Sequence, residues 1–582
     1  MKFPEVFAGL FLLLSLSLLP GLAGAAGKAN SGVTDAMLQH PNPKDWLMWR
    51  RTLNSWGYSP LKQVDRGNVK KLTLVWARPL SEGLQEGTPL EYNGVMYMPN
   101  PLNIIQAIKA DTGDLIWQYR RKLPKDLKIP FPSINRSIAI YGNLVIGLSA
   151  DDYVYAVNKD TGKLVWQTEI LDYRKDPSQQ SGGPIIADGK VISGRGCQPL
   201  PDGTPKACVI TAHDAKTGKE LWRTSTVEKY GGKNDSWGGL PFKKRVQVGS
   251  WNIPSYDPAL NLIYIGTSVT APAPNFLLSG NDHKYLYNDS TLALNPDTGK
   301  IVWYYQHLVD NWDLDHTFER LLVNTVVAPD RNAVKWINPD IKPGRKYEVV
   351  TGVPGKTGVV YTLDRKTGEF LWARPTIHQT VLKDINVRTG EVTDNPEALF
   401  HEKGEEKTIC PGGDGGKNWE AGSYSPLTNA MYMPMQNTCT RLTIGKSLSF
   451  ESFYGFTPHT MIAPGDTDVG TVYAISVKTG KTLWKYQQRA GTTSTLATGS
   501  GLLFVGDVNG RFRALDQKTG KVLWKVNLGS QVTGYPITYE VNGRQYVAVS
   551  TGSSWATNGI LGLTPELSAG NTNMLFVFAL PK

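Results

Sequence analysis

Short runs of alternating apolar and polar residues recur along the whole chain, and most of them are bounded by a tight polar triplet. Runs such as 155–157 and 514–516 lead into a triplet that ends in Thr-Gly, and a second apolar run that ends on Trp follows it. A period of two predicts β-strands. The Thr-Gly pair predicts a hairpin turn, because such turns need a residue with a positive φ.

This strand–turn–strand unit occurs eight times. The eight units end on Trp76, Trp117, Trp166, Trp222, Trp303, Trp372, Trp484 and Trp524, and only the first lacks Thr-Gly. A large ring at one fixed place in each unit predicts packing between neighbouring sheets. Further apolar runs lie between the units, so one repeat is about four strands in roughly 40 residues, the size of a propeller blade. The repeats therefore predict an all-β propeller.

The spacing of the tryptophans also predicts where the propeller carries insertions. Two intervals are much longer than the rest, and they indicate insertions around residues 223–290 and 373–470. Insertions in a propeller gather on one face, where a site is built. No change in composition divides the rest of the chain, so residues 26–582 are expected to form one domain. A chain of 582 residues that is 40% hydrophobic and 19% charged is not a disordered protein.

The N-terminus has the pattern of a secretory signal peptide over residues 1–25. Lys2 precedes an apolar run from Val6 to Leu19, and Ala23-Gly24-Ala25 provides a small-residue cleavage site. The alternative is a membrane anchor, but an apolar run of about 14 residues is shorter than the roughly 20 that span a bilayer. Cleavage after Ala25 and export to the periplasm are expected. After residue 25 the sequence has no run of 18 consecutive apolar residues, so no membrane-spanning segment is expected there.

Charge and cysteine content narrow the possible partners. The net charge is +11, but Lys and Arg are scattered rather than clustered, which disfavours nucleic-acid binding and suits an acidic partner. Four cysteines in an exported chain favour disulfides, and chain order pairs Cys197 with Cys208 and Cys410 with Cys439. The sequence has no Cys-x-x-Cys-His motif, so no covalently attached c-type haem is expected.

The repeat Ala-x-Asp-x-x-Thr-Gly-Lys-x-x-Trp resembles the tryptophan-docking motif of quinoprotein alcohol dehydrogenases. These enzymes depend on pyrroloquinoline quinone (PQQ). The resemblance covers about residues 45–580, from Asp45-Trp46 to Gly534-Tyr535-Pro536 and the strand that follows it. It implies an eight-bladed propeller that holds PQQ and Ca²⁺ or a lanthanide ion in a central funnel. It also implies alcohol oxidation with electrons passed to a separate cytochrome c.

The resemblance assigns the catalytic and metal-binding residues. The segment Trp312-Asp313-Leu314-Asp315 is similar to the family's Trp-Asp-x-Asp, whose first Asp is the general base and a metal neighbour. Asp313 is therefore the expected catalytic residue, since a carboxylate can accept the alcohol proton. Asp315 resembles the second acid of members that use lanthanides, because hard ions of higher charge favour more carboxylate ligands.

The resemblance also assigns cofactor contacts. Trp251 matches the indole that forms a floor under PQQ, and Arg136 matches an arginine that pairs with the cofactor carboxylates. Lys356 matches a basic residue near the quinone oxygens. Asn418 and Ser181 match hydrogen-bonding positions, and Ser181 replaces a family threonine.

Three departures from the family pattern are expected to matter. The adjacent cysteines that cover PQQ in other members are absent, and Phe131 is the expected cover instead. The family's metal-binding Glu corresponds to Gln198, and its Asn ligand to Thr270. Gln198, Thr270, Asp313 and Asp315 are thus the expected metal ligands. The second disulfide, Cys410–Cys439, matches a family disulfide in position.

The resulting hypothesis is a periplasmic PQQ-dependent oxidoreductase that converts an alcohol to an aldehyde or ketone. Two alternatives share the fold. One is a non-catalytic propeller scaffold of the outer-membrane assembly type, which has the same repeat but lacks long insertions. The other is a sugar or polyol dehydrogenase.

Overall fold

The indoles of the repeat pack against turn glycines of the following repeat in the computed structural model. The structure describes residues 32–128, 134–197, 205–229, 231–310, 312–445 and 455–582. A Cβ atom at Gly162 would lie 2.6 Å from Trp117, and one at Gly218 would lie 2.4 Å from Trp166. Trp117 Nε1 also donates a hydrogen bond to the Lys159 carbonyl, at 2.9 Å. The predicted role of the tryptophans in packing between sheets is confirmed.

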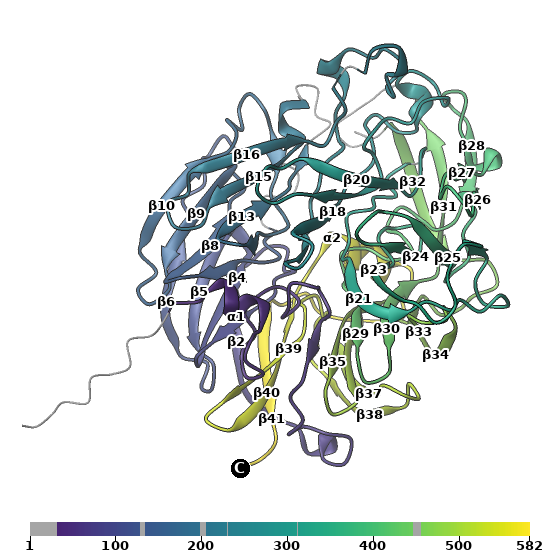
Figure 1. Ribbon diagram of the computed structural model, residues 1–582. Coiled ribbons are helices and arrows are strands. Elements are labelled where there is room, and N and C mark those ends of the chain that lie inside the picture. The colour runs from purple at the N-terminus through teal and green to yellow at the C-terminus, as the bar shows by residue number, and fades with distance from the viewer. Residues whose placement is uncertain (1–31, 129–133, 198–204, 230, 311, 446–454) are drawn as a thin grey trace, which may run out of the picture.

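Within the described ranges, the main strands form eight antiparallel meanders of four strands, an arrangement consistent with eight propeller blades (Figure 1). Two of these sheets carry a fifth short strand, β1 (Tyr58–Ser59), parallel to β35, and β22 (Trp336–Ile337). The predicted all-β propeller is thereby confirmed.

The first four meanders follow one another along the N-terminal half of the chain. They are β3 (Leu90–Tyr92), β4 (Val95–Asn100), β5 (Ile104–Lys109) and β6 (Leu115–Arg120); β7 (Ala139–Tyr141), β8 (Leu144–Leu148), β9 (Tyr153–Asn158) and β10 (Leu164–Glu169); β12 (Ile185–Ala187), β13 (Lys190–Ser193), β15 (Val209–Asp214) and β16 (Glu220–Ser225); and β17 (Ser255–Asp257), β18 (Leu262–Gly266), β19 (Ser290–Leu294) and β20 (Ile301–Gln306).

Three further meanders follow in the C-terminal half. They are β21 (Leu321–Val326), β23 (Lys346–Gly352), β24 (Val359–Asp364) and β25 (Phe370–Pro375); β29 (Ser423–Ser425), β30 (Ala430–Gln436), β33 (Gly470–Ser476) and β34 (Thr482–Gln488); and β35 (Thr492–Thr498), β36 (Leu502–Asp507), β37 (Arg511–Asp516) and β38 (Val522–Asn527).

The eighth meander joins the two ends of the ring. Strand β2 (Thr73–Pro79) pairs antiparallel with β41 (Met574–Ala579). In the same sheet β41 pairs with β40 (Arg544–Thr551), and β40 pairs with β39 (Ile537–Val541). One sheet therefore combines the first long strand of the chain with the last three. Pairing of strands from both ends of the chain in one sheet closes the ring.

Shorter sheets and helices accompany the eight main sheets. Small sheets are formed by β11 (Ser178–Gln179) with β14 (Gly196–Cys197), by β26 (Leu382–Ile385) with β27 (Val392–Asp394), and by β28 (Glu406–Ile409), β31 (Thr438–Ile444) and β32 (Phe456–Ile462). The helices are α1 (Asp35–Gln39), α2 (Trp555–Gly562), η1 (Val69–Lys71), η2 (Pro101–Asn103), η3 (Pro205–Ala207), η4 (Gly232–Asn234), η5 (Phe242–Lys244), η6 (Asn275–Leu277) and η7 (Pro396–Ala398).

Both expected disulfides are present. Cys197 is bonded to Cys208 and Cys410 to Cys439, so both predicted pairings are confirmed. Across the described part of the chain, no helix has the length and apolar character needed to cross a membrane. The expected signal peptide (1–25) and Phe131 lie outside the described residues.

The contact between turn glycine and indole can be tested with a matched pair of variants. We expect Gly162→Ala to lower the free energy of unfolding by about 1–3 kcal/mol more than Gly543→Ala does. Both glycines have a positive φ (68° and 75°), but a Cβ atom at Gly543 meets nothing within 4 Å. Urea denaturation measures the difference. Equal losses in the two variants would show that backbone strain, not the indole contact, accounts for the effect.

Candidate active site

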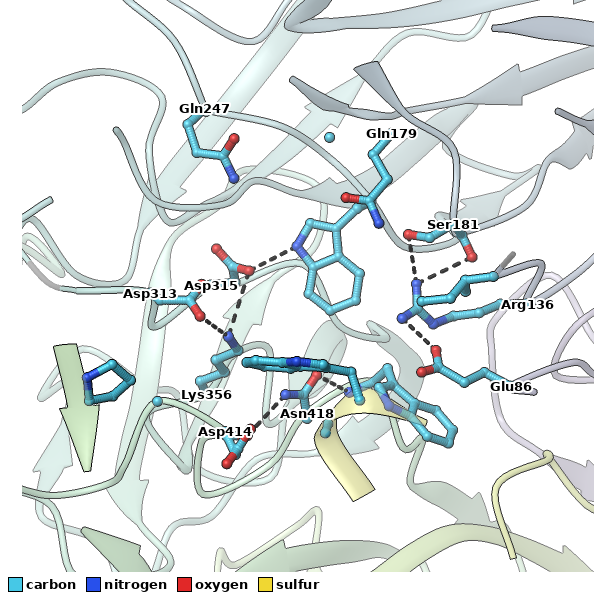
Figure 2. A pocket seen from close by; sticks show the side chains of 18 of the residues that line it. Glu86, Arg136, Gln179, Ser181, Gln247, Asp313, Asp315, Lys356, Asp414 and Asn418 are labelled. Carbon is cyan, nitrogen blue, oxygen red and sulfur yellow. Dashed lines mark hydrogen bonds and ion pairs between the residues drawn. The ribbon is translucent and has the colours of Figure 1, made fainter. Parts of the chain in front are cut away.

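A pocket of about 250 Å³ lies where loops from most of the sheets meet, and Figure 2 shows its side chains from close by. This volume is slightly below the range of about 300–1,000 Å³ in which proteins usually hold small molecules. Its walls come from loops that lead into the innermost strands, together with β32 and α2. The lining residues are Glu86, Ile134, Arg136, Gln179, Ser181, Gly196, Gln247, Trp251, Asp313, Asp315, Lys356, Gly413, Asp414, Asn418, Trp419, Phe456, Pro458, Thr460, Trp555 and Ala556.

A lysine ammonium lies between two carboxylates on one wall. Lys356 Nζ is 2.9 Å from Asp313 Oδ2 and 3.9 Å from Asp315 Oδ2. Burial lowers the pKa of Lys356, but the charges of Asp313 and Asp315 outweigh burial and raise it above its ordinary value. Lys356 is therefore a permanent cation at this end of the pocket.

The backbone at Asp313 is strained. Its φ of 106° lies in a region that residues with a side chain rarely adopt. Such conformations cost on the order of 1–3 kcal/mol and cluster at functional sites. Figure 2 shows the Asp313 carboxylate paired with Lys356.

The indole of Trp251 lies between the acidic wall and an arginine. Trp251 Nε1 donates to Asp315 Oδ2 at 2.9 Å, and the other Asp315 oxygen accepts from the Val269 amide at 3.1 Å. The guanidinium carbon of Arg136 is 4.9 Å from the centre of the Trp251 ring. Phe318 packs edge-on against the same ring at 5.6 Å, so the plane of the indole is held by contacts on several sides.

Arg136 is buried and partly paired. Its Nη2 lies 2.5 Å from Glu86 Oε2, and its Nη1 donates to Ser181 Oγ at 2.8 Å. Ser554 donates from its hydroxyl to the second oxygen of Glu86 at 2.5 Å. Arg136 Nε is buried with no hydrogen-bond partner among the described residues. The guanidinium thus keeps an unused donor at the pocket wall.

A glycine-rich loop between β28 and β29 forms the wall next to Lys356. Asn418 Nδ2 donates to the Asp414 carbonyl at 3.0 Å, and its Oδ1 accepts from the Trp419 amide at 2.8 Å. The neighbouring Lys417 is fully buried and pairs with Glu319 at 2.7 Å. Burial raises the pKa of Asp414 to about 6, against the opposing charge of Lys356.

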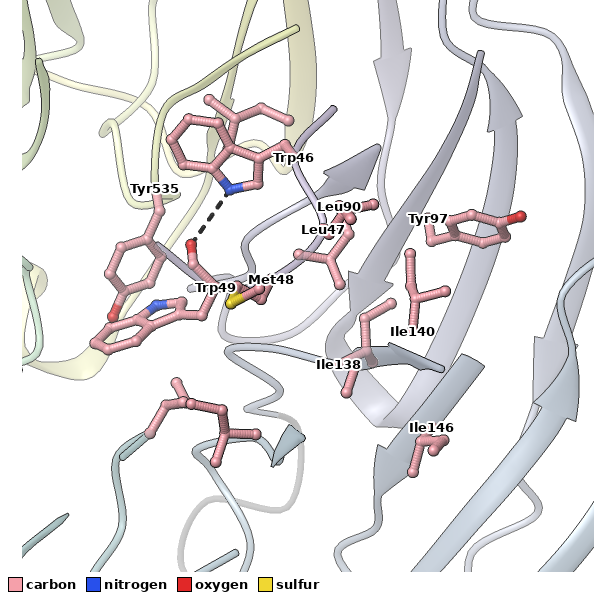
Figure 3. Packing of buried hydrophobic residues seen from close by; sticks show 14 of the residues in the cluster. Trp46, Leu47, Met48, Trp49, Leu90, Tyr97, Ile138, Ile140, Ile146 and Tyr535 are labelled. Atoms are coloured by element: carbon pink, nitrogen blue, oxygen red, sulfur yellow. Dashed lines mark hydrogen bonds between the residues drawn. The ribbon is translucent and has the colours of Figure 1, made fainter. Parts of the chain in front are cut away.

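Four buried apolar residues of the N-terminal segment, 46–49, pack behind this wall and are called the apolar plug (Figure 3). Trp49 packs edge-on against Tyr535 at 5.6 Å, and Tyr535 packs against the pocket-lining Trp419 at the same distance. The Tyr535 hydroxyl donates to the Trp419 carbonyl at 2.8 Å. Arg50, which follows the plug, donates to the carbonyls of Gly422 and Thr495. Arg50 therefore ties the plug to two blades.

The structure brings seven of the sequence-predicted residues into this one pocket. They are Arg136, Ser181, Trp251, Asp313, Asp315, Lys356 and Asn418. They come from loops separated by up to 282 residues of sequence, and only the ring topology places them together.

Two expected metal ligands do not join the described pocket. Thr270 is fully buried, does not line the pocket, and its hydroxyl donates to Asn275 Oδ1 at 3.0 Å. Gln198 lies outside the described residues. The two residues that precede it in the sequence are described: Gly196 lines the pocket, and Cys197 is bonded to Cys208.

Sequence reasoning missed Glu86, Asp414 and α2. Glu86 stands in a loop with no motif, and its partner Arg136 is 50 residues away. Asp414 had a usable signal, because an acid within the stretch GGDGG (412–416) indicates a tightly packed loop. Helix α2 carries no polar motif and joins the site only through packing.

The family model described as "PQQ: Glucose/ethanol/alcohol dehydrogenase, beta-propeller domain" matches residues 46–389 and 469–547. The chain is similar to the quinoprotein alcohol dehydrogenase PedH of Pseudomonas putida, with 32% identity over 98% of this chain and 96% of that protein. It is 30% identical to the quinohemoprotein alcohol dehydrogenase ADH IIB of the same species, over 98% of this chain and 82% of that protein.

Among solved structures, the fold is similar to a europium-containing methanol dehydrogenase. The TM-score is 0.81 at 25% identity, and the match covers 94% of this chain and 99% of that one. The quinohemoprotein alcohol dehydrogenase ADHIIG of Pseudomonas putida has the same TM-score at 26% identity, over 94% of this chain and 82% of that one.

The buried pair of Glu86 and Arg136 predicts a stability effect that does not depend on any ligand. We expect Glu86→Gln to lower the free energy of unfolding by about 3 kcal/mol, because it leaves Arg136 as an uncompensated buried charge. The double variant Glu86→Gln/Arg136→Met should regain part of that loss. Urea denaturation of the two variants measures both effects, and a Glu86→Gln variant as stable as the wild type would contradict the prediction.

Proposed function

The chain belongs to the family of PQQ-dependent alcohol dehydrogenases, and on that basis we propose that the central pocket is its active site. The protein is an oxidoreductase that oxidises an alcohol with PQQ as cofactor. The observation that best supports the location is the cluster Asp313–Lys356–Asp315 beside the indole of Trp251.

The described residues fit PQQ. The cofactor is planar and has three carboxylates, so it needs a flat partner and fixed hydrogen-bond donors. Trp251 supplies the flat surface. Arg136 supplies a buried guanidinium whose Nε has no partner among the described residues, and Ser181 and Asn418 supply a hydroxyl and an amide at the pocket wall. These four residues would hold the cofactor.

The donor set also fits a hard metal ion. Asp313 and Asp315 are the two acids that face Lys356, and no group of three or more His, Cys, Asp or Glu side chains suited to a metal occurs in the described ranges. The ion would therefore rest on these two carboxylates and on neutral oxygen donors, for which Gln198 is the proposed candidate, since the Thr270 hydroxyl is bonded to Asn275 away from the pocket. Ca²⁺ and lanthanides both prefer such oxygen ligands.

Different pocket residues have different roles in the proposed reaction. PQQ, when bound, supplies the quinone that accepts two electrons from the alcohol, and the metal ion supplies a Lewis acid. Asp313 accepts the hydroxyl proton of the alcohol at a carboxylate oxygen. Lys356 orients the Asp313 carboxylate through the ion pair of 2.9 Å between its Nζ and Asp313 Oδ2. Trp251 fixes Asp315 through Nε1.

We further propose that the protein works in the periplasm and reduces a separate cytochrome c. The signal-peptide pattern over residues 1–25 supports export. The net charge of +11 is unchanged by cleavage after Ala25, because Lys2 and Glu5 cancel. A basic protein of this kind suits an acceptor with an acidic surface.

The scaffold alternative has less support. A scaffold has no need of a strained Asp313, a buried Lys356 between two acids and an arginine donor with no partner in the described chain. The relatives that the chain matches over nearly its whole length are named alcohol dehydrogenases.

Reconstitution tests the proposed active site. Purified protein is titrated with PQQ in the presence of Ca²⁺ or La³⁺, and dye reduction is measured with a panel of alcohols. We expect Asp313→Asn to bind PQQ but to lose roughly 100- to 10,000-fold in kcat, because the proton acceptor is gone. Asp340→Asn, which removes an exposed acid paired with Arg388, is the control and should keep wild-type turnover. No turnover by the wild type with either ion would overturn the proposal.

The proposed acceptor predicts a dependence on salt. We expect the rate of reduction of an acidic cytochrome c to fall by about tenfold or more between low ionic strength and 0.15 M, because salt screens the attraction between opposite charges. Dye reduction under the same conditions serves as the control and should change little. A cytochrome rate that does not change with salt would contradict the role assigned to the charge.

A further inference from the structure

Asp414 is a pocket acid whose position is fixed by its surroundings. It stands in the loop 410–418, which the Cys410–Cys439 disulfide ties at one end. The Asn418 side chain holds the Asp414 carbonyl, and the Gly416 amide donates to the Lys356 carbonyl at 2.7 Å. Gly415, at φ 86°, lets the loop turn where a Cβ atom would lie 2.3 Å from the Lys417 carbonyl oxygen.

The Asp414 carboxylate has no partner among the described residues, although the residue is only 9% exposed. No hydrogen bond or ion pair with the described chain reaches its side-chain oxygens, and Lys356 acts on it only through its charge. The other acids of the pocket differ: Glu86 is paired with Arg136, and Asp313 with Lys356. A carboxylate with no partner is unfavourable in such a place unless something that enters the pocket binds it.

The position of this carboxylate relates it to the reacting end of the substrate. Figure 2 shows Asp313 and Asp414 on opposite sides of Lys356. Helix α2 packs over Asp414, since a Cβ atom at Gly559 would lie 3.0 Å from Asp414 Oδ2. Trp555 at the start of α2 also lines the pocket and is 59% exposed. Asp313, Asp414 and Trp555 therefore line the same pocket, with Lys356 between the two acids.

We propose that Asp414 binds a second hydrogen-bond donor on the substrate, so that the enzyme prefers alcohols with a distal hydroxyl or ammonium group to simple alkanols. This inference rests on the proposed function. An ionised carboxylate only accepts hydrogen bonds, so it rewards a donor and is left unpaired beside an alkyl chain. A hydrogen bond to a charged group discriminates by roughly 10- to 100-fold.

The test compares three alcohols of equal chain length in the reconstituted holoenzyme. The values of kcat/KM are measured for 1-butanol, 1,4-butanediol and 4-amino-1-butanol, with the diol corrected for its two equivalent hydroxyls. We expect the wild type to favour at least one of the two donor-bearing alcohols, and Asp414→Leu to reduce that preference by roughly 10- to 100-fold. An unchanged preference would overturn the inference.

The variant Asp414→Asn distinguishes a distal hydroxyl from a distal ammonium group. It also provides a second test if Asp414→Leu does not fold. It keeps an acceptor oxygen but loses the charge. If the distal group is a hydroxyl, Asp414→Asn retains most of the preference; if it is an ammonium, the preference falls nearly as far as in Asp414→Leu. Either result supports the inference, whereas a wild type that shows no preference for either donor overturns it. Asp466→Asn, an exposed surface acid outside the pocket, is the control and should match the wild type.

A PQQ titration followed by absorbance distinguishes substrate binding from cofactor binding. If Asp414→Leu and Asp414→Asn weaken PQQ binding by tenfold or more, Asp414 is a cofactor contact and the inference is wrong. A wild-type protein that oxidises none of the three alcohols, nor any other in the panel, overturns the proposed function and this inference with it. Turnover with unchanged ratios overturns the inference alone.

Discussion

The contact between an indole and the turn glycine of the next repeat is the constraint on which the rest of the structure depends. Trp117 fills the space above Gly162, and Trp166 fills the space above Gly218, so each sheet is located by its neighbour. These contacts add to a hydrophobic core of aliphatic side chains that runs from sheet to sheet, including Ile105, Ile140 and Ile192.

The pocket concentrates buried charge in a way that such a rigid ring can support. Arg136, Lys356 and Lys417 are each buried next to an acid, so most of the desolvation cost is offset by a partner. The partners stand on different loops, and their separations are held by sheets that cannot easily shift. A site of this kind is organised before any ligand arrives, which lowers the cost of binding and of charge rearrangement.

The sequence predicts the propeller well because its repeat is local: each strand, turn and tryptophan falls within about 15 residues. Residues such as Trp251, Asp313 and Lys356 were predictable only through their resemblance to a family motif. Glu86 was not predictable, since its role depends on its pairing with Arg136 from the next sheet, and the glycine-rich stretch around Asp414 indicates a packed loop but not its place in the pocket. Thr270 was assigned by its place in the chain, but its hydroxyl is bonded to Asn275, five residues away, and not directed at the pocket.

The sheet that joins β2 to β39–β41 imposes an order on folding. Strand β2 is the first long strand to emerge, and its hydrogen-bonding edge stays unpaired until residues 574–579 arrive. Contacts between positions about 500 residues apart are slow to form, and an open strand edge is a template for wrong pairings. The chain is therefore most prone to aggregate just before β41 is available for pairing. When residues 574–579 pair with β2, the ring of sheets is closed.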